Sequence, residues 1–169
     1  MNGIRYVSLI LFPLALGGVI LVCIKIVDTL PSKLPIALLS IILAIILLFF
    51  WYKAGRSFAE NFRDLRVAVL IGNGLPIILT ILYIWQTVFT PYEEANAFLV
   101  RLAHLYFAPL FVTLEMAVLP IGSSAVSGVQ RPPVSVIAQI TFLILFIWIF
   151  ARGYLSAHGH CNRKTRYRR

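Results

Sequence analysis

Charge is scarce in this chain, and acidic charge is the scarcest. Only 6 of the 169 residues are Asp or Glu and 15 are Lys or Arg, so charged residues make up 12% of the sequence, whereas soluble domains contain about 25%. Hydrophobic residues make up 60% of the chain, and the mean hydropathy is +0.92. A water-soluble domain of this length could not bury so many apolar side chains. The composition therefore excludes an ordinary soluble domain and predicts an integral membrane protein.

Residues that commonly carry catalysis or bind cofactors are also few. The chain has three histidines and two cysteines. His158, His160 and Cys161 near the C-terminus lack the spacing of a structural zinc site, and Cys23 lies on a different segment from Cys161, so two free thiols are expected. No HExxH motif, no pair of intramembrane histidines or aspartates and no Ser/His/Asp set stands out. We therefore expect no enzymatic activity, no cofactor and no bound metal.

Four apolar runs are long enough to cross a bilayer as helices, since a span needs about 20 mostly apolar residues. The predicted fold class is an all-α integral membrane protein, in which a helical bundle over residues 1–151 forms homo-oligomers and a basic cytoplasmic tail follows over residues 152–169. The four predicted spans cover approximately residues 6–24, 34–52, 67–89 and 134–151.

A fifth apolar stretch, residues 95–120, is harder to interpret. It contains Arg101, His104 and Glu115, with Pro109 in its middle. A central charge in a span costs about 2.5–3.5 kcal/mol, and a proline deletes one helical hydrogen bond and clashes with the preceding turn. Three alternatives follow: a polar-faced fifth span, a Pro-broken re-entrant pair of half-helices, or an amphipathic helix lying in the membrane interface.

The distribution of basic residues favours four spans. Cytoplasmic segments of membrane proteins are enriched in Lys and Arg. With four crossings both termini lie on the same side as the segment 53–66, which gathers most of the basic residues there, whereas a fifth crossing would move the tail across and divide them. We therefore predict cytoplasmic N and C termini in a bacterial inner (plasma) membrane. The basic residues gathered on that side are Arg5, Lys53, Arg56, Arg63, Arg66, Arg152, Arg163, Lys164, Arg166, Arg168 and Arg169.

Three ionisable residues of the stretch 95–120 share one helical face. Arg101, His104 and Glu115 are spaced by three and eleven residues, and eleven residues make about three helical turns. Such a face can line a water path or relay protons. Alternatively, the three groups satisfy one another or face the headgroups.

Small and polar residues in two of the predicted spans indicate contacts between helices. Glycine allows close helix approach, and Asn, Thr or Gln can form hydrogen bonds across an interface. Thr80 lies seven residues after Asn73 and Thr87 seven after Thr80, so the three share a face, and Gln139 in the last span is a candidate partner. The predicted contact residues, within the chain or between subunits, are Gly72, Asn73, Gly74, Thr80, Thr87 and Gln139.

The segment 53–66 has amphipathic helical character, because Phe58, Phe62 and Leu65 recur at spacings of four and three residues. Together with the basic tail it predicts a surface for anionic lipid headgroups or for a cytoplasmic protein partner, whereas direct binding of nucleic acid is not expected. The residues predicted for this surface are Lys53, Arg56, Phe58, Phe62, Arg63, Arg66, Arg163, Lys164, Arg166, Arg168 and Arg169.

These observations lead to two functional hypotheses. The first is a non-catalytic multi-pass subunit that oligomerises and anchors, or signals to, a cytoplasmic partner, as in a bacterial defence or signalling complex by architectural analogy alone. The second is an oligomeric ion or proton channel, or a small transporter, that uses the polar face of residues 95–120. Since four helices are too few to enclose a wide path, the second hypothesis requires a homo-oligomer.

Overall fold

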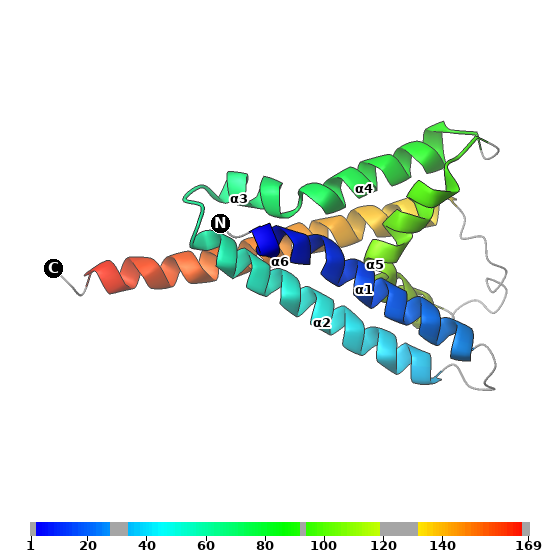
Figure 1. The fold of residues 1–169 in the computed structure, drawn as a ribbon, viewed down its shortest axis with the longest axis horizontal. Helices are drawn as coiled ribbons and strands as arrows, with labels where there is room; N and C mark the ends of the chain where they lie inside the picture. The colour runs from blue at the N-terminus through cyan, green and yellow to red at the C-terminus, as the bar shows by residue number, and fades with distance from the viewer. Residues whose placement is uncertain (1–2, 28–33, 92–93, 119–131, 167–169) are drawn as a thin grey trace.

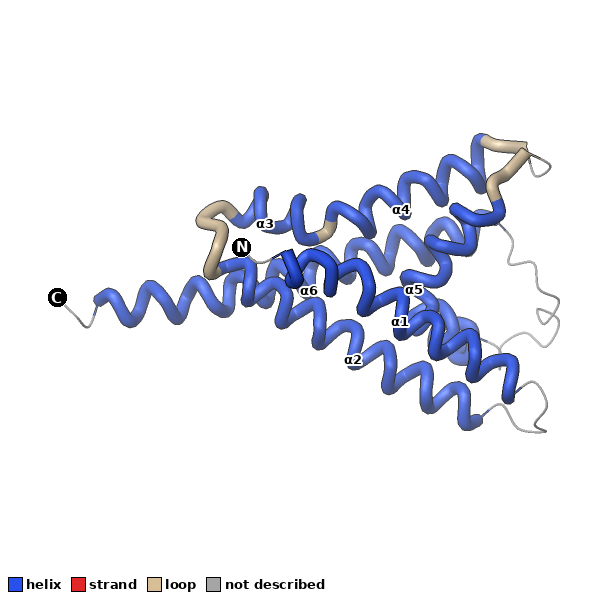
Figure 2. Tube along the Cα trace, in the orientation of Figure 1, coloured by secondary structure: helices blue, strands red, loops and turns tan. Residues whose placement is uncertain are grey.

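The computed structural model describes residues 3–27, 34–91, 94–118 and 132–166 (Figure 1). Every regular element in these ranges is a helix (Figure 2), which confirms the all-α prediction for them. The elements in chain order are α1 (Gly3–Val27), α2 (Leu34–Ala59), α3 (Leu65–Gly72), α4 (Gly74–Ile84), the π-helical turn η1 (Trp85–Phe89), α5 (Ala97–Val118) and α6 (Pro132–Arg166).

Four of these helices are long and apolar enough to cross a membrane. Their qualifying segments are Val7–Lys25, Pro35–Ala59, Ala97–Leu114 and Ser135–Ala157. The pair Leu65–Gly72 and Gly74–Phe89 also qualifies when it is taken as one broken span. This set of helices is compatible with a multi-pass membrane protein.

The run 67–89, expected to be one span, contains a bend of 57° between α3 and α4. The physical reason is Pro76, which has no N–H to donate to the carbonyl of Gly72 and whose ring clashes with that carbonyl in a continuous helix. Accordingly, α3 ends at Gly72. The Asn73 side chain covers this end by donating from Nδ2 to the carbonyl of Val69 at 3.1 Å.

Pro109 does not end the helix, because α5 runs from Ala97 to Val118 as one element. The helix nevertheless changes direction near its middle, so that both its ends lie at the same end of the bundle (Figure 1). Pro109 leaves the carbonyl of Leu105 without its usual helical donor. Gly17 of α1 lies against this carbonyl so closely that a Cβ at Gly17 would collide with the oxygen. The backbone of α1 thus packs directly against the carbonyl that the proline leaves open.

Pro13 in α1 is accommodated by a side chain of α5. It leaves the carbonyl of Leu9 without its helical donor, and the Tyr106 hydroxyl of α5 donates to that carbonyl at 3.0 Å. Tyr106 is fully buried. Pro13 is therefore compensated by a hydrogen bond from α5, and at Pro109 the backbone of α1 packs against the open carbonyl, so α1 and α5 meet closely at both prolines.

Helix α5 begins and ends at the same end of the bundle (Figure 1). Just before its first residue, the Asn96 backbone N–H donates to Gln86 Oε1 of η1 at 2.6 Å. Near its other end, the Thr113 hydroxyl donates to Ser40 Oγ at 3.3 Å, close to the start of α2. In Figures 1 and 2, α5 occupies the space where α4 diverges from α1 and α2, while both termini lie toward the opposite end.

Helices α2 and α6 form the closest pair. A Cβ at Gly55 would collide with the carbonyl oxygen of Phe150, and one at Gly153 with that of Tyr52. Glycine on both helices therefore lets the two backbones touch. Beside this crossing, Trp51 of α2 stacks on Phe146 of α6 with ring centroids 4.7 Å apart, so the centre of the bundle is closed by aromatic rings.

The compensation of Pro13 by α5 predicts an energetic coupling between Tyr106 and Pro13. Replacing Tyr106 with Phe removes the donor to the Leu9 carbonyl and is expected to lower the free energy of unfolding by about 1–3 kcal/mol. In a Pro13→Ala background the restored N–H can donate to that carbonyl, so the loss should shrink. Unfolding in detergent micelles, analysed as a double-mutant cycle, measures the coupling. Tyr154→Phe is the matched control and should show no coupling to Pro13→Ala; strict additivity of the Tyr106 and Pro13 variants would contradict the assignment.

Candidate functional sites: an internal polar cluster and a basic end

The structure describes the side chains of two of the three residues of the predicted relay face, Arg101 and His104. His104 is half-buried, with its Nε2 3.1 Å from the Tyr83 hydroxyl of α4 and its ring stacked on Phe111 at 4.8 Å between centroids. Arg101 is exposed, and no hydrogen bond joins it to His104 in the described part of the chain. Glu115 belongs to α5, but its side chain lies outside the described residues.

His104 instead belongs to a hydrogen-bonded chain that joins three helices. The Tyr83 hydroxyl donates to Ser135 Oγ of α6 at 2.7 Å. Since a tyrosine hydroxyl has one proton to donate, His104 is then the donor to Tyr83 through Nε2–H. Sequence reasoning missed Tyr83 and Ser135, although Tyr83 lies three residues after Thr80 on the same helical face, which was a usable signal.

Two buried polar side chains lie one turn deeper along the same pair of helices. Thr80 precedes Tyr83 by three residues and Gln139 follows Ser135 by four, which places them on the same faces of α4 and α6. Thr80 is 2% exposed and Gln139 0%. Thr80 Oγ1 and both polar atoms of the Gln139 amide have no hydrogen-bond partner among the described residues. A buried polar group without a partner costs about 1–3 kcal/mol, so this pair is a costly feature of the core.

Asn73 marks the other polar contact in the interior. Its Oδ1 accepts from Trp51 Nε1 of α2 at 2.8 Å, so the bend between α3 and α4 is tied to α2. A Cβ at the neighbouring Gly72 would collide with the Phe150 ring of α6, whereas one at Gly74 would meet nothing within 4 Å. Of the predicted contact residues, Gly72 and Asn73 therefore make their contacts within the chain.

Thr87, which the sequence places on the same helical face as Asn73 and Thr80, lies in the π-helical turn η1. A π turn holds more residues than an α turn, so Thr87 is not in the angular position that seven residues of α-helix after Thr80 would give. Thr87 is half-buried.

The segment 53–66 is divided between α2 and a turn. Helix α2 continues to Ala59, and Asp64 Oδ1 accepts from the Arg66 backbone N–H at 2.8 Å, which caps α3. Phe58 is buried between Phe62 and Phe150. The aromatic side of this segment therefore packs inside the chain.

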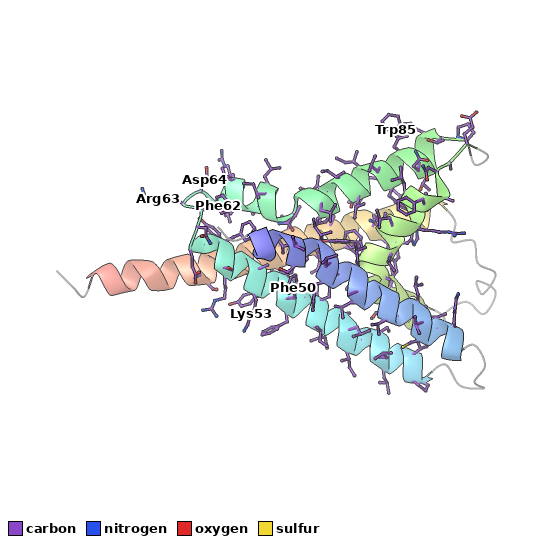
Figure 3. All side chains as sticks on the ribbon, viewed as in Figure 1. Phe50, Lys53, Phe62, Arg63, Asp64 and Trp85 are labelled. Carbon is purple, nitrogen blue, oxygen red and sulfur yellow. The ribbon has the colours of Figure 1, made fainter. Side chains whose placement is uncertain are left out.

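The basic residues of this segment lie outside that packing. Lys53, Arg56, Arg63 and Arg66 are all exposed. Figure 3 shows Lys53 on α2 and Arg63 and Asp64 at the turn between α2 and α3. This end of the bundle is also the end toward which both termini lie (Figure 1); we call it the basic end.

Helix α6 extends past the basic end. Its apolar section closes at Ala157, yet the helix runs on to Arg166 and projects beyond α2 and α3 (Figure 1). Arg163, Lys164 and Arg166 belong to this projecting part. Arg168 and Arg169 of the predicted surface lie outside the described residues.

Among the described residues, no group of three or more His, Cys, Asp or Glu side chains is placed to hold a metal ion. The side chains of His158, His160 and Cys161 fall outside these ranges. No family model, no curated protein and no solved structure matches this chain.

The two buried amides are predicted to respond in opposite ways to the same substitution. Asn73→Leu leaves the Trp51 N–H without an acceptor and should lower the free energy of unfolding by about 1–3 kcal/mol. Gln139→Leu removes polar atoms that have no partner, so stability should be unchanged or raised. Thermal unfolding in detergent micelles compares the two variants directly. An equal loss in both would show that Gln139 is satisfied in the folded protein.

Proposed function

We propose that this protein is a non-catalytic membrane subunit that holds a cytoplasmic partner at the membrane through the projecting C-terminal part of α6. The observation that supports the proposal is the length of α6. The helix has 35 residues, and the apolar section Ser135–Ala157 accounts for 23 of them. At about 1.5 Å per residue the helix is far longer than the ~30 Å of hydrocarbon in a bilayer. Its surplus lies at the C-terminal end and carries Arg163, Lys164 and Arg166.

The proposed membrane placement uses four crossings. These are α1, α2, the bent series α3–α4–η1, and α6, while α5 enters and leaves from one side. The position of both ends of α5 at one end of the bundle supports this re-entrant arrangement. Lys53, Arg56, Arg63, Arg66 and Arg152 then face the same side as both termini, and cytoplasmic segments are the ones enriched in Lys and Arg.

The geometry favours this tether over an ion or proton path. Hydrogen bonds join His104, Tyr83 and Ser135, but Thr80 and Gln139, one turn further along, have no hydrogen-bond partner among the described residues. Beyond them, the stack of Trp51 on Phe146 closes the centre of the bundle. A path through one chain would require these rings to move.

The tether also does not depend on contacts between copies of the chain. Asn73, Thr80 and Gln139, which sequence reasoning offered for contacts within or between subunits, are buried inside one chain. The proposal therefore stands for a monomer as well as for a homo-oligomer.

Thiol labelling tests the placement. In a Cys23→Ala variant the only thiol is Cys161, near the end of α6. A membrane-impermeant maleimide is expected to leave it unlabelled in intact bacterial cells and to label it in inverted vesicles. A Cys23→Ala/Cys161→Ala/Ser124→Cys variant is the control and should be labelled in intact cells. Labelling of Cys161 from outside intact cells would refute the cytoplasmic location of the basic end.

Charge neutralisation tests the tether itself. The full-length Arg163→Gln/Lys164→Gln/Arg166→Gln variant should recover its cytoplasmic partner from cross-linked membranes roughly tenfold less well than the wild type, if each charge contributes about 0.5 kcal/mol. Quantitative mass spectrometry of the purified complexes measures the recovery.

The matched control for the tether is Lys25→Gln/Lys33→Gln/Arg101→Gln, which removes the same charge elsewhere in the chain. It should retain the partner at the wild-type level. Equal recovery from the wild type and the tail variant, or equal loss in both variants, would mean that α6 does not hold the partner.

A further inference from the structure

The crossing of α2 and α6 has an outward side, which can be located from successive residues. On α2, Trp51 points into the core, where its Nε1 donates to Asn73, and the carbonyl of the next residue, Tyr52, touches Gly153. Successive helical residues are about 100° apart. Lys53 therefore lies on the side of the crossing that faces away from the core, and it is exposed.

On α6 the core, contact and outward positions also follow one another, but in the opposite direction along the chain. The buried Tyr154 points inward, where its hydroxyl donates to the carbonyl of Phe62 at 2.7 Å, and Gly153 makes the contact with α2. Arg152 is one step further round and is exposed. Lys53 and Arg152 thus flank the outward side of the crossing at the same level of the two helices, and we call this side the α2–α6 surface. Between the helices the Tyr52 hydroxyl donates to Ser156 Oγ at 3.0 Å.

Both cations lie over an aromatic ring of their own helix. Lys53 Nζ is 5.3 Å from the centroid of the Phe49 ring, and the Arg152 guanidinium carbon is 5.2 Å from that of Trp148. The rings are 59% and 55% exposed, respectively. Each ring lies one turn nearer the middle of the bundle than its cation, which is the order of an aromatic belt beneath the headgroups. No carboxylate pairs with Lys53 or Arg152 in the part of the chain that the structure describes.

On each helix, the cation is followed toward the middle of the bundle by a row of exposed apolar side chains, which we call an apolar stripe. Ile45 precedes Phe49 by four residues on α2, and Ile144 precedes Trp148 by four residues on α6. Both isoleucines are exposed. Residues four apart lie along one side of a helix, so two exposed apolar stripes run from the cations toward the middle of the bundle.

We propose that the α2–α6 surface binds one anionic diacyl phospholipid. Lys53 and Arg152 hold its phosphate, the hydroxyl pair of Tyr52 and Ser156 lies beside the phosphate, and the acyl chains lie along the two apolar stripes. The two positive charges without carboxylate partners match the headgroup, and the stripes match two chains, which a free phosphate ester lacks. This inference rests on the proposed membrane placement but not on the tether.

Native mass spectrometry of the full-length protein, released from neutral detergent micelles, tests the site. The probes are phosphatidylglycerol, phosphatidylcholine and glycerol phosphate. The wild type should retain phosphatidylglycerol in preference to phosphatidylcholine and should not retain glycerol phosphate. Lys53→Gln/Arg152→Gln should weaken phosphatidylglycerol binding roughly 30-fold, since each basic residue near an anionic surface contributes about fivefold.

The matched control is Lys25→Gln/Arg101→Gln, which removes one Lys and one Arg that are also exposed and should leave binding unchanged. Lys53→Arg/Arg152→Lys keeps both charges and should restore binding if the neutral variant folds normally. Equal weakening in the two neutral variants, no preference between the lipids, or equal retention of glycerol phosphate would overturn the proposal. Because the assay contains no other protein and no bilayer, its outcome is independent of the thiol-labelling and partner-recovery results.

Discussion

Every backbone polar group in the apolar interior needs a partner, and three prolines test this constraint. Pro13, Pro76 and Pro109 each remove a helical donor, and the structure answers each one differently. Tyr106 donates to the carbonyl that Pro13 leaves open, and Gly17 packs against the one that Pro109 leaves open. At Pro76 the chain bends instead, and Asn73 covers the end of α3. The position of α5 against α1 and the direction of α4 follow from these compensations.

The position of α5 in turn decides which polar groups meet. Because α5 fills the space between α4 and the pair α1 and α2, His104 reaches Tyr83, and Thr113 reaches Ser40. At the other end the glycine contact of α2 with α6 leaves no room for a helix between them. Hydroxyl and imidazole groups thus connect the helices at one end of the bundle. At the other end Lys53 and Arg152 have no carboxylate partner among the described residues and lie over aromatic rings.

The sequence predicted the helices well because a long apolar run can be identified from the sequence without knowing what it packs against. The run Gly72-Asn73-Gly74 before Pro76 does indicate a kink in the sequence, whereas the outcome at Pro109 depends on how α5 packs against its neighbours and could not be predicted from the sequence. Asn73 and Gln139 were both expected at contacts, yet only Asn73 has a partner in the described chain. Phe58, a candidate for contact with lipid, a partner or the bundle itself, packs between Phe62 and Phe150 of α6, so its aromatic surface is used inside the chain.

The continuity of α6 connects the internal cluster with the basic end. Ser135 lies near its start, Gly153 at its contact with α2 and Arg166 at its end. A flexible linker would let a bound partner sample many distances from the membrane. A helix of constant rise, clamped at Gly153, instead fixes both the height and the rotation of its projecting charges relative to Arg152. A partner held by those charges would therefore bind in one orientation beside the proposed lipid site, which makes α2 and α6 the structural core of the proposed function.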